Sequence, residues 1–305
     1  MKLKKVISEH KIPVIISCIM IILIIAAAAV MAAKSRQNVQ SVSDIIENED
    51  FETKKTHPPK HTYNLKNIKD ENGWKKYYDN NGRLISVYGI DVSYHQNDID
   101  WQKIKNQGIS FVMLRMGYRG YESGDLFIDQ KFDEYAKGAA DAGINVGVYF
   151  FSQSVNAEEA AEEARFVVDT LKDYDITYPV AYDWEPVEEK TSRTHPVDYP
   201  ELTQSSIAFC DIIKAAGYTP VVYASRSLAL HNYDLSLITG YDLWLAEYFD
   251  KPEYPYSFTM WQYSCDGIVD GIDGRVDLNI CFKDYSNPEK SGDSETTDTV
   301  LSNNQ

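Results

Sequence analysis

The sequence is short of basic residues. Its 305 residues include 46 aspartates and glutamates against 30 lysines and arginines, which gives a formal net charge of -16. A chain with this balance has no broad basic surface for a phosphate backbone or an anionic lipid headgroup. The composition therefore argues against nucleic-acid binding. It also means that any polyanionic substrate would have to be met by local cationic groups.

Metal-binding patterns are missing from the sequence, and cysteine is scarce. There is no H-E-x-x-H motif and no cluster of cysteine and histidine, so we predict no metal and no cofactor. Cys18 lies in an apolar run, and the helical spacing of Cys210 from two isoleucines predicts a core position. Cys265 and Cys281 follow or end neighbouring predicted strands, and the sequence leaves open whether they form a disulfide.

One apolar run is long enough to cross a membrane. Residues 12–33 carry no charge over 22 positions, and four lysines precede them. Such a run can span a bilayer as a helix, and the lysines would keep the N-terminus in the cytoplasm. Residues 1–33 are therefore predicted to be a cytoplasmic tip and a single-pass anchor that places the rest of the chain outside. A cleaved signal peptide is the alternative, because small residues near the end of the run could form a cleavage site.

Composition divides the rest of the chain into three parts. Residues 34–84 are polar and charged and are predicted to be a linker, with an aromatic hairpin near 73–84 that packs against the main domain. Residues 85–284 alternate short apolar runs with helical stretches and are predicted to form the folded domain. Residues 285–305 are predicted to be a disordered acidic tail.

The pattern of the folded domain predicts an α/β barrel. Helices are expected at 129–142, 157–172 and 203–216, the second with Asn156 as its N-cap. Strands that alternate with helices indicate a parallel sheet, and eight strand candidates favour a closed barrel over an open sheet. Because the later connections are too short for full helices, we predict an irregular, TIM-like single-domain β/α barrel of eight strands with fewer helices. The predicted strands are 88–93, 111–118, 145–152, 178–185, 220–225, 242–248, 258–264 and 276–282.

Acidic residues lie near the ends of these strands. Asp183 and Glu185 are two residues apart at the end of the strand at 178–185, so their side chains should point to the same face. Two close carboxylates repel each other, which raises one pKa and leaves the acid and charged pair that glycoside hydrolysis uses. Asp91 and Asp277 lie on the first and eighth strands, which are neighbours in a closed barrel, so they could meet.

A lone D-x-E pattern also occurs in solvated loops, so the other strand ends decide the interpretation. Barrel enzymes carry their chemistry at the carboxyl ends of the strands. Four acids and many aromatic rings around one barrel mouth are typical of a sugar-binding cleft. The predicted substrate-binding residues are Tyr149, Phe151, Arg115, Tyr118, Tyr223, Trp244, Trp261 and Gln262.

Three further polar residues have alternative interpretations. Arg115 is expected to pair with one of the site acids rather than to bind substrate directly, although both are possible for a cation at this position. His95 is expected in a loop or at the rim, and Glu247 is either a subsite residue or a solvated strand end.

Four motifs follow one another from about residue 88 to 282. They are Gly89-Ile-Asp-Val-Ser93, Asp183-Trp-Glu185, Trp261-Gln-Tyr263 and Val276-Asp-Leu-Asn279. In this order they resemble glycoside hydrolase family 25, the Chalaropsis-type lysozymes or N-acetylmuramidases. The resemblance implies an irregular β/α barrel that hydrolyses the β-1,4 bond from N-acetylmuramic acid to N-acetylglucosamine in the peptidoglycan glycan strand.

The resemblance also implies roles for the four acids. Glu185 falls at the position of the general acid, and Asp183 at that of the acid that assists the substrate acetamido group or stabilises the transition state. Asp91 and Asp277 match the two further acids of the family site.

Two alternative functions stay open at the level of sequence. An endo-β-N-acetylglucosaminidase or chitinase-like barrel also ends a strand in D-x-E, although the longer D-x-x-D-x-D-x-E pattern is absent here. A non-catalytic glycan-binding module of a cell-envelope complex is the other alternative, and the intact Asp183 and Glu185 argue against it. The expected location is the cell membrane with the barrel outside, or secretion after signal cleavage, and cell-envelope partners are unknown.

Overall fold

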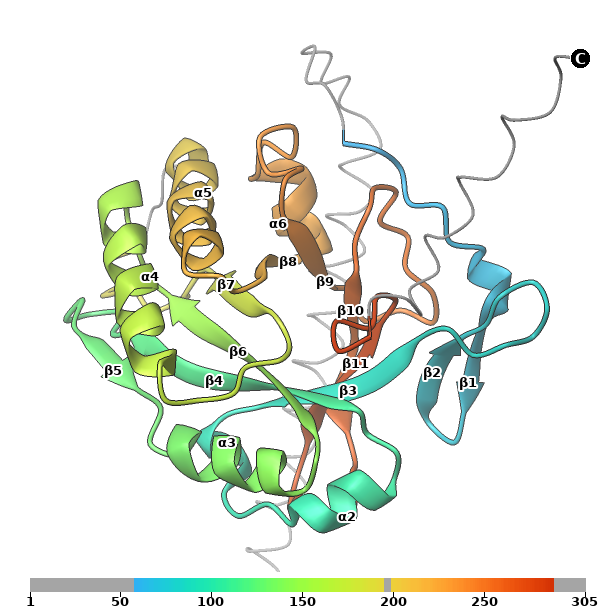
Figure 1. Ribbon diagram of the computed structural model, residues 1–305. Coiled ribbons are helices and arrows are strands. Elements are labelled where there is room, and N and C mark those ends of the chain that lie inside the picture. The colour runs from blue at the N-terminus through green and yellow to red at the C-terminus, as the bar shows by residue number, and fades with distance from the viewer. Residues whose placement is uncertain (1–57, 195–198, 288–305) are drawn as a thin grey trace, which may run out of the picture. The chain divides into compact units, whose positions relative to one another are not determined.

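The computed structural model describes residues 58–194 and 199–287 (Figure 1). The predicted membrane segment at residues 12–33 lies outside the described residues, as does nearly all of the predicted acidic tail. Among the helices that are described, none combines the length and the apolar character needed to cross a bilayer.

Eight strands close into a barrel, as the sequence predicts. Around the barrel the order is β3-β11-β10-β9-β8-β7-β6-β4, and pairing of β3 with β4 closes the ring. Neighbouring strands are parallel, except that β11 runs antiparallel to both β10 and β3. The strands are β3 (Val87–Val92), β4 (Phe111–Arg119), β6 (Asn145–Ser152), β7 (Val180–Trp184), β8 (Pro220–Ser225), β9 (Asp242–Ala246), β10 (Met260–Gly267) and β11 (Val276–Cys281).

Helices follow the earlier strands, and the connections from β9 to β10 and from β10 to β11 have none. On the outside of the barrel α4 packs against α5, as Figure 1 shows. The three long helices match the predicted ones. Two short helices of six residues each were not predicted, because they are too short to show a clear periodic pattern. The helices are α2 (Trp101–Asn106), α3 (Phe132–Asp141), α4 (Ala157–Leu171), α5 (Tyr199–Ala215) and α6 (Arg226–His231).

Local signals set the ends of these helices. The Asn156 side chain accepts a hydrogen bond from the backbone N–H of Glu159 at 2.9 Å, which confirms it as the N-cap of α4. Gly143 and Gly217 follow α3 and α5 with positive φ angles of 69° and 92°, a backbone conformation that glycine adopts without steric cost.

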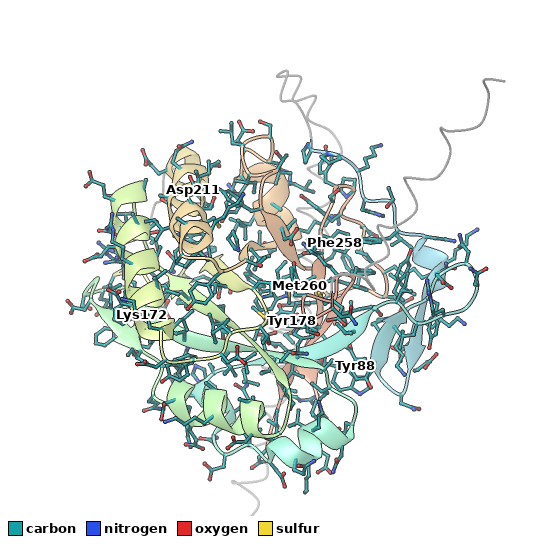
Figure 2. The ribbon with its side chains drawn as sticks, viewed as in Figure 1. Tyr88, Lys172, Tyr178, Asp211, Phe258 and Met260 are labelled. Atoms are coloured by element: carbon teal, nitrogen blue, oxygen red, sulfur yellow. The ribbon has the colours of Figure 1, made fainter. Side chains whose placement is uncertain are left out.

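Side chains of the barrel strands alternate between two apolar layers. On β10, Met260 joins a cluster inside the barrel, and Trp261 joins the larger cluster between the strands and the helices. Figure 2 marks Met260 and Tyr178 of the inner cluster. Cys210 is fully buried in the outer cluster, which confirms the predicted core position. The inner cluster consists of Phe111, Met113, Tyr178, Ala181, Val221, Tyr223, Trp244, Ala246, Met260 and Cys281.

The two cysteines for which a disulfide was left open are both thiols. Cys281 is buried, and its Sγ donates to the Lys283 carbonyl oxygen at 2.8 Å. Cys265 is exposed on β10. The structure therefore favours the alternative without a bond between them.

A small hairpin precedes the barrel. Strands β1 (Ile68–Glu71) and β2 (Trp74–Tyr77) pair antiparallel across a turn at Asn72 and Gly73. The predicted Asn-Gly turn at residues 81–82 is present as well, and the chain pairs again between Tyr78 and Leu84.

The hairpin contacts the barrel, as predicted, and so do the residues before it, where the sequence predicts linker. The Tyr63 ring stacks on Phe282 with centroids 4.2 Å apart, and the Trp74 ring lies 4.8 Å from that of Tyr88. These aromatic side chains bury apolar area that a solvated linker would leave in water. A further short strand, β5 (Leu126–Ile128), pairs with the end of β4.

Candidate active site

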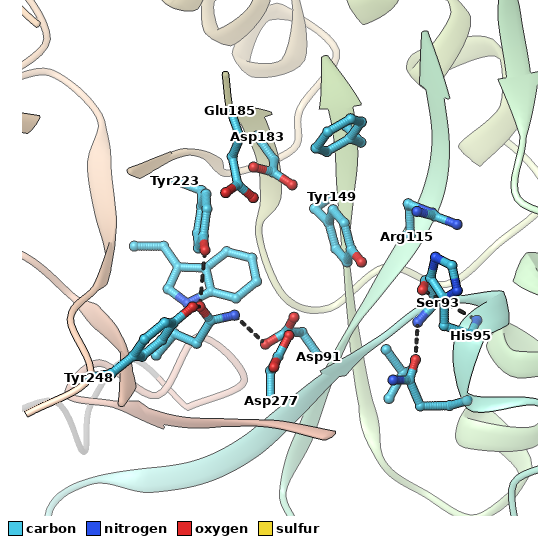
Figure 3. Close-up of a pocket in the computed structure, with 15 residues that line it drawn as sticks. Asp91, Ser93, His95, Arg115, Tyr149, Asp183, Glu185, Tyr223, Tyr248 and Asp277 are labelled. Carbon is cyan, nitrogen blue, oxygen red and sulfur yellow. Dashed lines mark hydrogen bonds between the residues drawn. The ribbon is translucent and has the colours of Figure 1, made fainter. Parts of the chain in front are cut away.

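A cavity of about 290 Å³ opens at the carboxyl ends of the parallel barrel strands (Figure 3). All four predicted acids line it, together with most of the predicted substrate-binding residues. The complete lining is Asp91, Val92, Ser93, His95, Gln96, Arg115, Tyr149, Phe151, Asp183, Glu185, Tyr223, Trp244, Tyr248, Gln262 and Asp277.

Asp91 and Asp277 form one carboxyl pair. They lie opposite each other where β3 and β11 pair, so the predicted meeting of the first and last strands is confirmed. Gln262 Nε2 and Asn279 Nδ2 donate to the same oxygen, Asp91 Oδ2, at 2.9 and 2.6 Å. Trp244 Nε1 in turn donates to Asn279 Oδ1 at 2.8 Å, which fixes the direction of that amide.

Burial controls the protonation of this pair. It raises the pKa of Asp91, although the two amide donors act in the opposite direction by stabilising the charged form. Burial and the negative charge of Asp91 raise the pKa of Asp277 to about 9. Asp277 therefore keeps its proton at neutral pH and donates it in a hydrogen bond to Asp91.

Asp183 and Glu185 form the second carboxyl pair. Figure 3 shows their carboxyl groups side by side at the end of β7, as the same-face rule for strands predicts. Asp183 is only 5% exposed, and its Oδ1 is buried without a hydrogen-bond partner among the described residues. Glu185 follows the strand and is exposed at the rim. The acid at the rim is thus the one that a ligand can reach first.

Both members of the second pair have raised pKa values, whereas the sequence predicts one. Burial raises the pKa of Asp183 well above its usual range, and the charge of Glu185 adds to this. Desolvation of its carboxyl group in the cavity raises the pKa of Glu185 as well, although the residue as a whole is exposed at the rim, and Asp277 adds to this only where it is ionised. The interaction between the two carboxyl groups raises the pKa of Asp183 and lowers that of Glu185, so the pair can share one proton.

Gln262 links the first carboxyl pair to the opposite wall. Its Oε1 accepts hydrogen bonds from the hydroxyls of Tyr223 and Tyr248 at 2.9 and 2.8 Å. Two donors on the oxygen leave the amide nitrogen to face Asp91, so the orientation of Gln262 is fixed.

Arg115 has a different ionic partner from the one expected. Its Nε donates to Asp129 Oδ2 at 2.7 Å, and Asp129 is not one of the four acids. The guanidinium lies over the rings of Tyr94 and Tyr118, 4.9 and 5.3 Å from their centroids. Tyr118 therefore supports Arg115 and does not itself line the cavity. The Nη2 of Arg115 has no hydrogen-bond partner among the described residues.

The prediction that Trp261 forms a cleft wall is wrong. Its side chain is fully buried in the outer layer, and its Nε1 donates to the carbonyl oxygen of Glu247 at 2.7 Å. Neighbouring residues of a strand point to opposite faces, and Gln262 occupies the cavity side. Glu247 fits neither of its two interpretations, because its buried carboxylate accepts the backbone N–H groups of Glu253 and Tyr254.

The sequence analysis did not identify some of the lining residues. Tyr248 lies four positions after Trp244, so the alternation along the predicted strand could have placed it in the cavity. Ser93 and Gln96 form a capping box on the short 3₁₀ helix after β3, and His95 lies at the rim as expected.

Comparison with known proteins gives the chain its family context. Residues 90–272 match the family model described as glycosyl hydrolases family 25. The protein YegX of Escherichia coli is 28% identical over 199 residues, covering 64% of this chain and 69% of that protein. The autolytic lysozyme of Clostridium acetobutylicum is 26% identical over 192 residues, covering 63% of this chain and 54% of the lysozyme.

A solved structure with similar architecture is the modular autolysin LytC from Streptococcus pneumoniae in complex with a synthetic peptidoglycan ligand. The TM-score is 0.57 at 26% identity, and the match covers 70% of this chain but only 51% of LytC, so this chain spans about half the length of that relative. The family match extends over more than half of the 305 residues and includes Asp91, Asp183 and Glu185 at the cavity. The chain therefore belongs to glycosyl hydrolases family 25 and is a glycoside hydrolase.

Proposed function

We propose that the protein hydrolyses the β-1,4 bond from N-acetylmuramic acid to N-acetylglucosamine in peptidoglycan. The observation that carries this proposal is the meeting of two carboxyl pairs with raised pKa values in one cavity, with Glu185 at the exposed rim. The lysozyme of Clostridium acetobutylicum and the peptidoglycan ligand of LytC support the choice of substrate.

Glu185 would act as the general acid and base of this reaction. The proton shared with Asp183 moves to Glu185 and then to the leaving oxygen as the bond to the anomeric carbon breaks. Both carboxylates of the pair are then charged, and buried Asp183 stabilises the positive charge that develops on the sugar. Water finally attacks the anomeric carbon and returns a proton to Glu185.

The experiment is digestion of purified peptidoglycan, followed by mass and reducing-end analysis of the fragments. We expect muramic acid at the new reducing ends. Replacing Glu185 with glutamine should lower the rate by about 10²–10⁴-fold, because proton transfer to the leaving group is lost. Glu188→Gln, in an exposed position of the same segment, is the matched control and should retain the wild-type rate.

Three other outcomes would contradict the proposal or part of it. Glucosamine at the new reducing ends would identify an endo-β-N-acetylglucosaminidase. Binding to wall material with no fragments released by the wild type would identify a glycan-binding module. A Glu185→Gln variant that is folded and fully active would remove Glu185 from the proposed role.

We also propose that the enzyme is held at the cell membrane by residues 12–33, with the barrel outside. The basis is the uncharged run of 22 residues with lysines before it. This location fits local remodelling of the cell wall, alone or with cell-envelope partners.

A further inference from the structure

The N-terminal segment, defined here as residues 58–77, lies against the β9–β10 loop, residues 247–259. The backbone N–H of Ser257 donates to the Pro59 carbonyl at 2.9 Å, and the N–H of His61 donates to that of Pro255 at 3.3 Å. An isolated antiparallel bridge joins Lys60 to Tyr256 between these two bonds. The start of the segment is thus paired with the far end of the loop.

A lysine of the hairpin holds the near end of the same loop. The Lys75 ammonium lies 2.6 Å from Asp250 Oδ1 and, within the hairpin, 3.7 Å from Asp70 Oδ2. The lysine side chain is only 9% exposed, whereas that of Asp250 is 85% exposed. The backbone N–H of Lys75 donates to the Tyr263 hydroxyl on β10 at 3.3 Å. A buried ammonium is unfavourable unless it is paired, so this contact constrains where Asp250 can lie.

The loop held in this way carries one wall of the cavity. Tyr248 lies two residues before Asp250 and lines the cavity, and its hydroxyl donates to Gln262 Oε1 at 2.8 Å. Gln262 donates in turn to Asp91. The Tyr248 ring is 51% exposed, and between β9 and β10 the loop contains no helix or strand. The Glu247 carboxylate holds Glu253 and Tyr254 from within the loop, and the N-terminal segment adds the contacts at Asp250 and at residues 255–257 from outside it.

We propose that the N-terminal segment is part of the catalytic unit, with Lys75 as a positioning residue that holds Tyr248 at the substrate cavity. The segment precedes residue 90, where the match to the family model begins, so it lies outside the matched region. The exposed ring of Tyr248 offers a flat apolar face to a sugar, and Lys75 limits how far that ring can move. The inference about substrate rests on the proposed function, but the positioning itself does not.

The test compares the full chain with Lys75→Met and Asp250→Asn, which break the same contact from its buried and its exposed side. Lys76→Met is the matched control, because Lys76 is the next residue of β2 and pairs with Glu71 inside the hairpin at 3.0 Å. Without substrate, hydrogen exchange measured by mass spectrometry should rise at least threefold for peptides covering residues 247–257 in both test variants. It should stay at the wild-type rate in the control.

The kinetic readout uses soluble peptidoglycan oligomers. We expect KM to rise about three- to tenfold in Lys75→Met and Asp250→Asn, with kcat within twofold of the wild type. In a Tyr248→Leu background the same two substitutions should have no further effect on KM, because they act through that ring.

Each outcome tests either the positioning of Tyr248 by Lys75 or the proposed function. Unchanged exchange in the loop, or an equal rise in KM with and without the Tyr248 ring, overturns the positioning inference. A lower melting temperature with unchanged KM assigns Lys75 a purely structural role and overturns it as well. If Lys75→Met does not fold, Asp250→Asn tests the same contact, because it changes the exposed partner. A wild type that releases no fragments overturns the proposed function, and the exchange result remains interpretable.

Discussion

At the scale of single residues, Asp277 lets the native state bind a proton that the unfolded chain releases at neutral pH. Its usual pKa of 3.8 is raised to about 9 in the fold, by burial first and by the charge of Asp91 second. Between these two values the unfolded chain loses the proton and the native protein keeps it. Asp277 therefore lowers the free energy of unfolding progressively as pH rises through this window, and has no such effect below about pH 4.

Replacing Asp277 with asparagine should stabilise the protein at neutral pH. The linkage alone sets an upper limit of about 4 kcal/mol at pH 7, and water access to the cavity reduces the expected gain to about 1–3 kcal/mol. The asparagine amide can still donate to Asp91. Urea unfolding between pH 4 and pH 8 measures the difference, which should vanish towards pH 4. A difference in the free energy of unfolding that stays constant across this range would contradict the raised pKa of Asp277. The Asp277→Asn variant should also hydrolyse substrate more slowly than the wild type at every pH.

Gln153 holds the backbone of the proposed catalytic acid. Its Nε2 donates to the carbonyl oxygens of Glu185 and Ser152 at 2.9 and 2.8 Å, and its Oε1 accepts from the Thr194 hydroxyl at 2.8 Å. Gln153→Leu should lower kcat about tenfold or more with little change in KM, because Glu185 loses its fixed position. Thr194→Val, which removes one donor to the glutamine, is the milder control. Equal kcat values in Gln153→Leu and wild type would remove Gln153 from this role.

Strand alternation was enough to predict the four acids, because each follows from its place on one strand and from closure of the barrel. The role of Gln153 could not be predicted in this way. Its partners lie 32 and 41 residues away on segments without regular structure, and no local pattern records such contacts. Arg115 shows the same limit, since its partner Asp129 lies in a turn before α3.

At the scale of elements, the alternation of side chains along strand β10 allows only one of two predicted residues into the cavity. Trp261 and Gln262 are neighbours, so only one of them can face the cavity, yet both were predicted to bind substrate. The predicted packing of the hairpin against the main domain is confirmed, but its strand pairing differs from the expected one. Strand β2 pairs upstream with β1, and the aromatic contacts that hold it reach Tyr88 and Phe282, far along the chain.

Trp261 should therefore affect stability and not substrate binding. Trp261→Phe leaves a gap in the outer layer and removes the hydrogen bond to the Glu247 carbonyl, which should cost about 2–4 kcal/mol. Urea unfolding measures the loss, and KM of the folded fraction should match the wild type. Phe151→Leu, at a position that lines the cavity, should raise KM instead. A raised KM in Trp261→Phe at wild-type stability would return Trp261 to the cleft wall.

At the scale of the whole molecule, the net charge of -16 leaves recognition of an anionic substrate to local groups. Arg115 is the arginine among the residues that line the cavity, and its Nη2 has no partner among the described residues. If residues 12–33 anchor the protein as proposed, this negative charge would disfavour contact of the barrel with anionic lipid, and the chain before the barrel would limit how far it can diffuse.

The location of the protein can be tested by fractionation of cells. Expressed in full, the chain should sediment with membranes, resist washing with high salt and carbonate, and dissolve in detergent, because residues 12–33 would lie in the bilayer. A variant lacking residues 1–33 should be found in the supernatant, with kcat and KM on short glycan oligomers within about twofold of those of the full chain. The mass of the mature protein decides between the two sequence-based alternatives. A chain that begins near residue 34 identifies a cleaved signal and removes the anchor, whereas an intact N-terminus in the membrane fraction supports it.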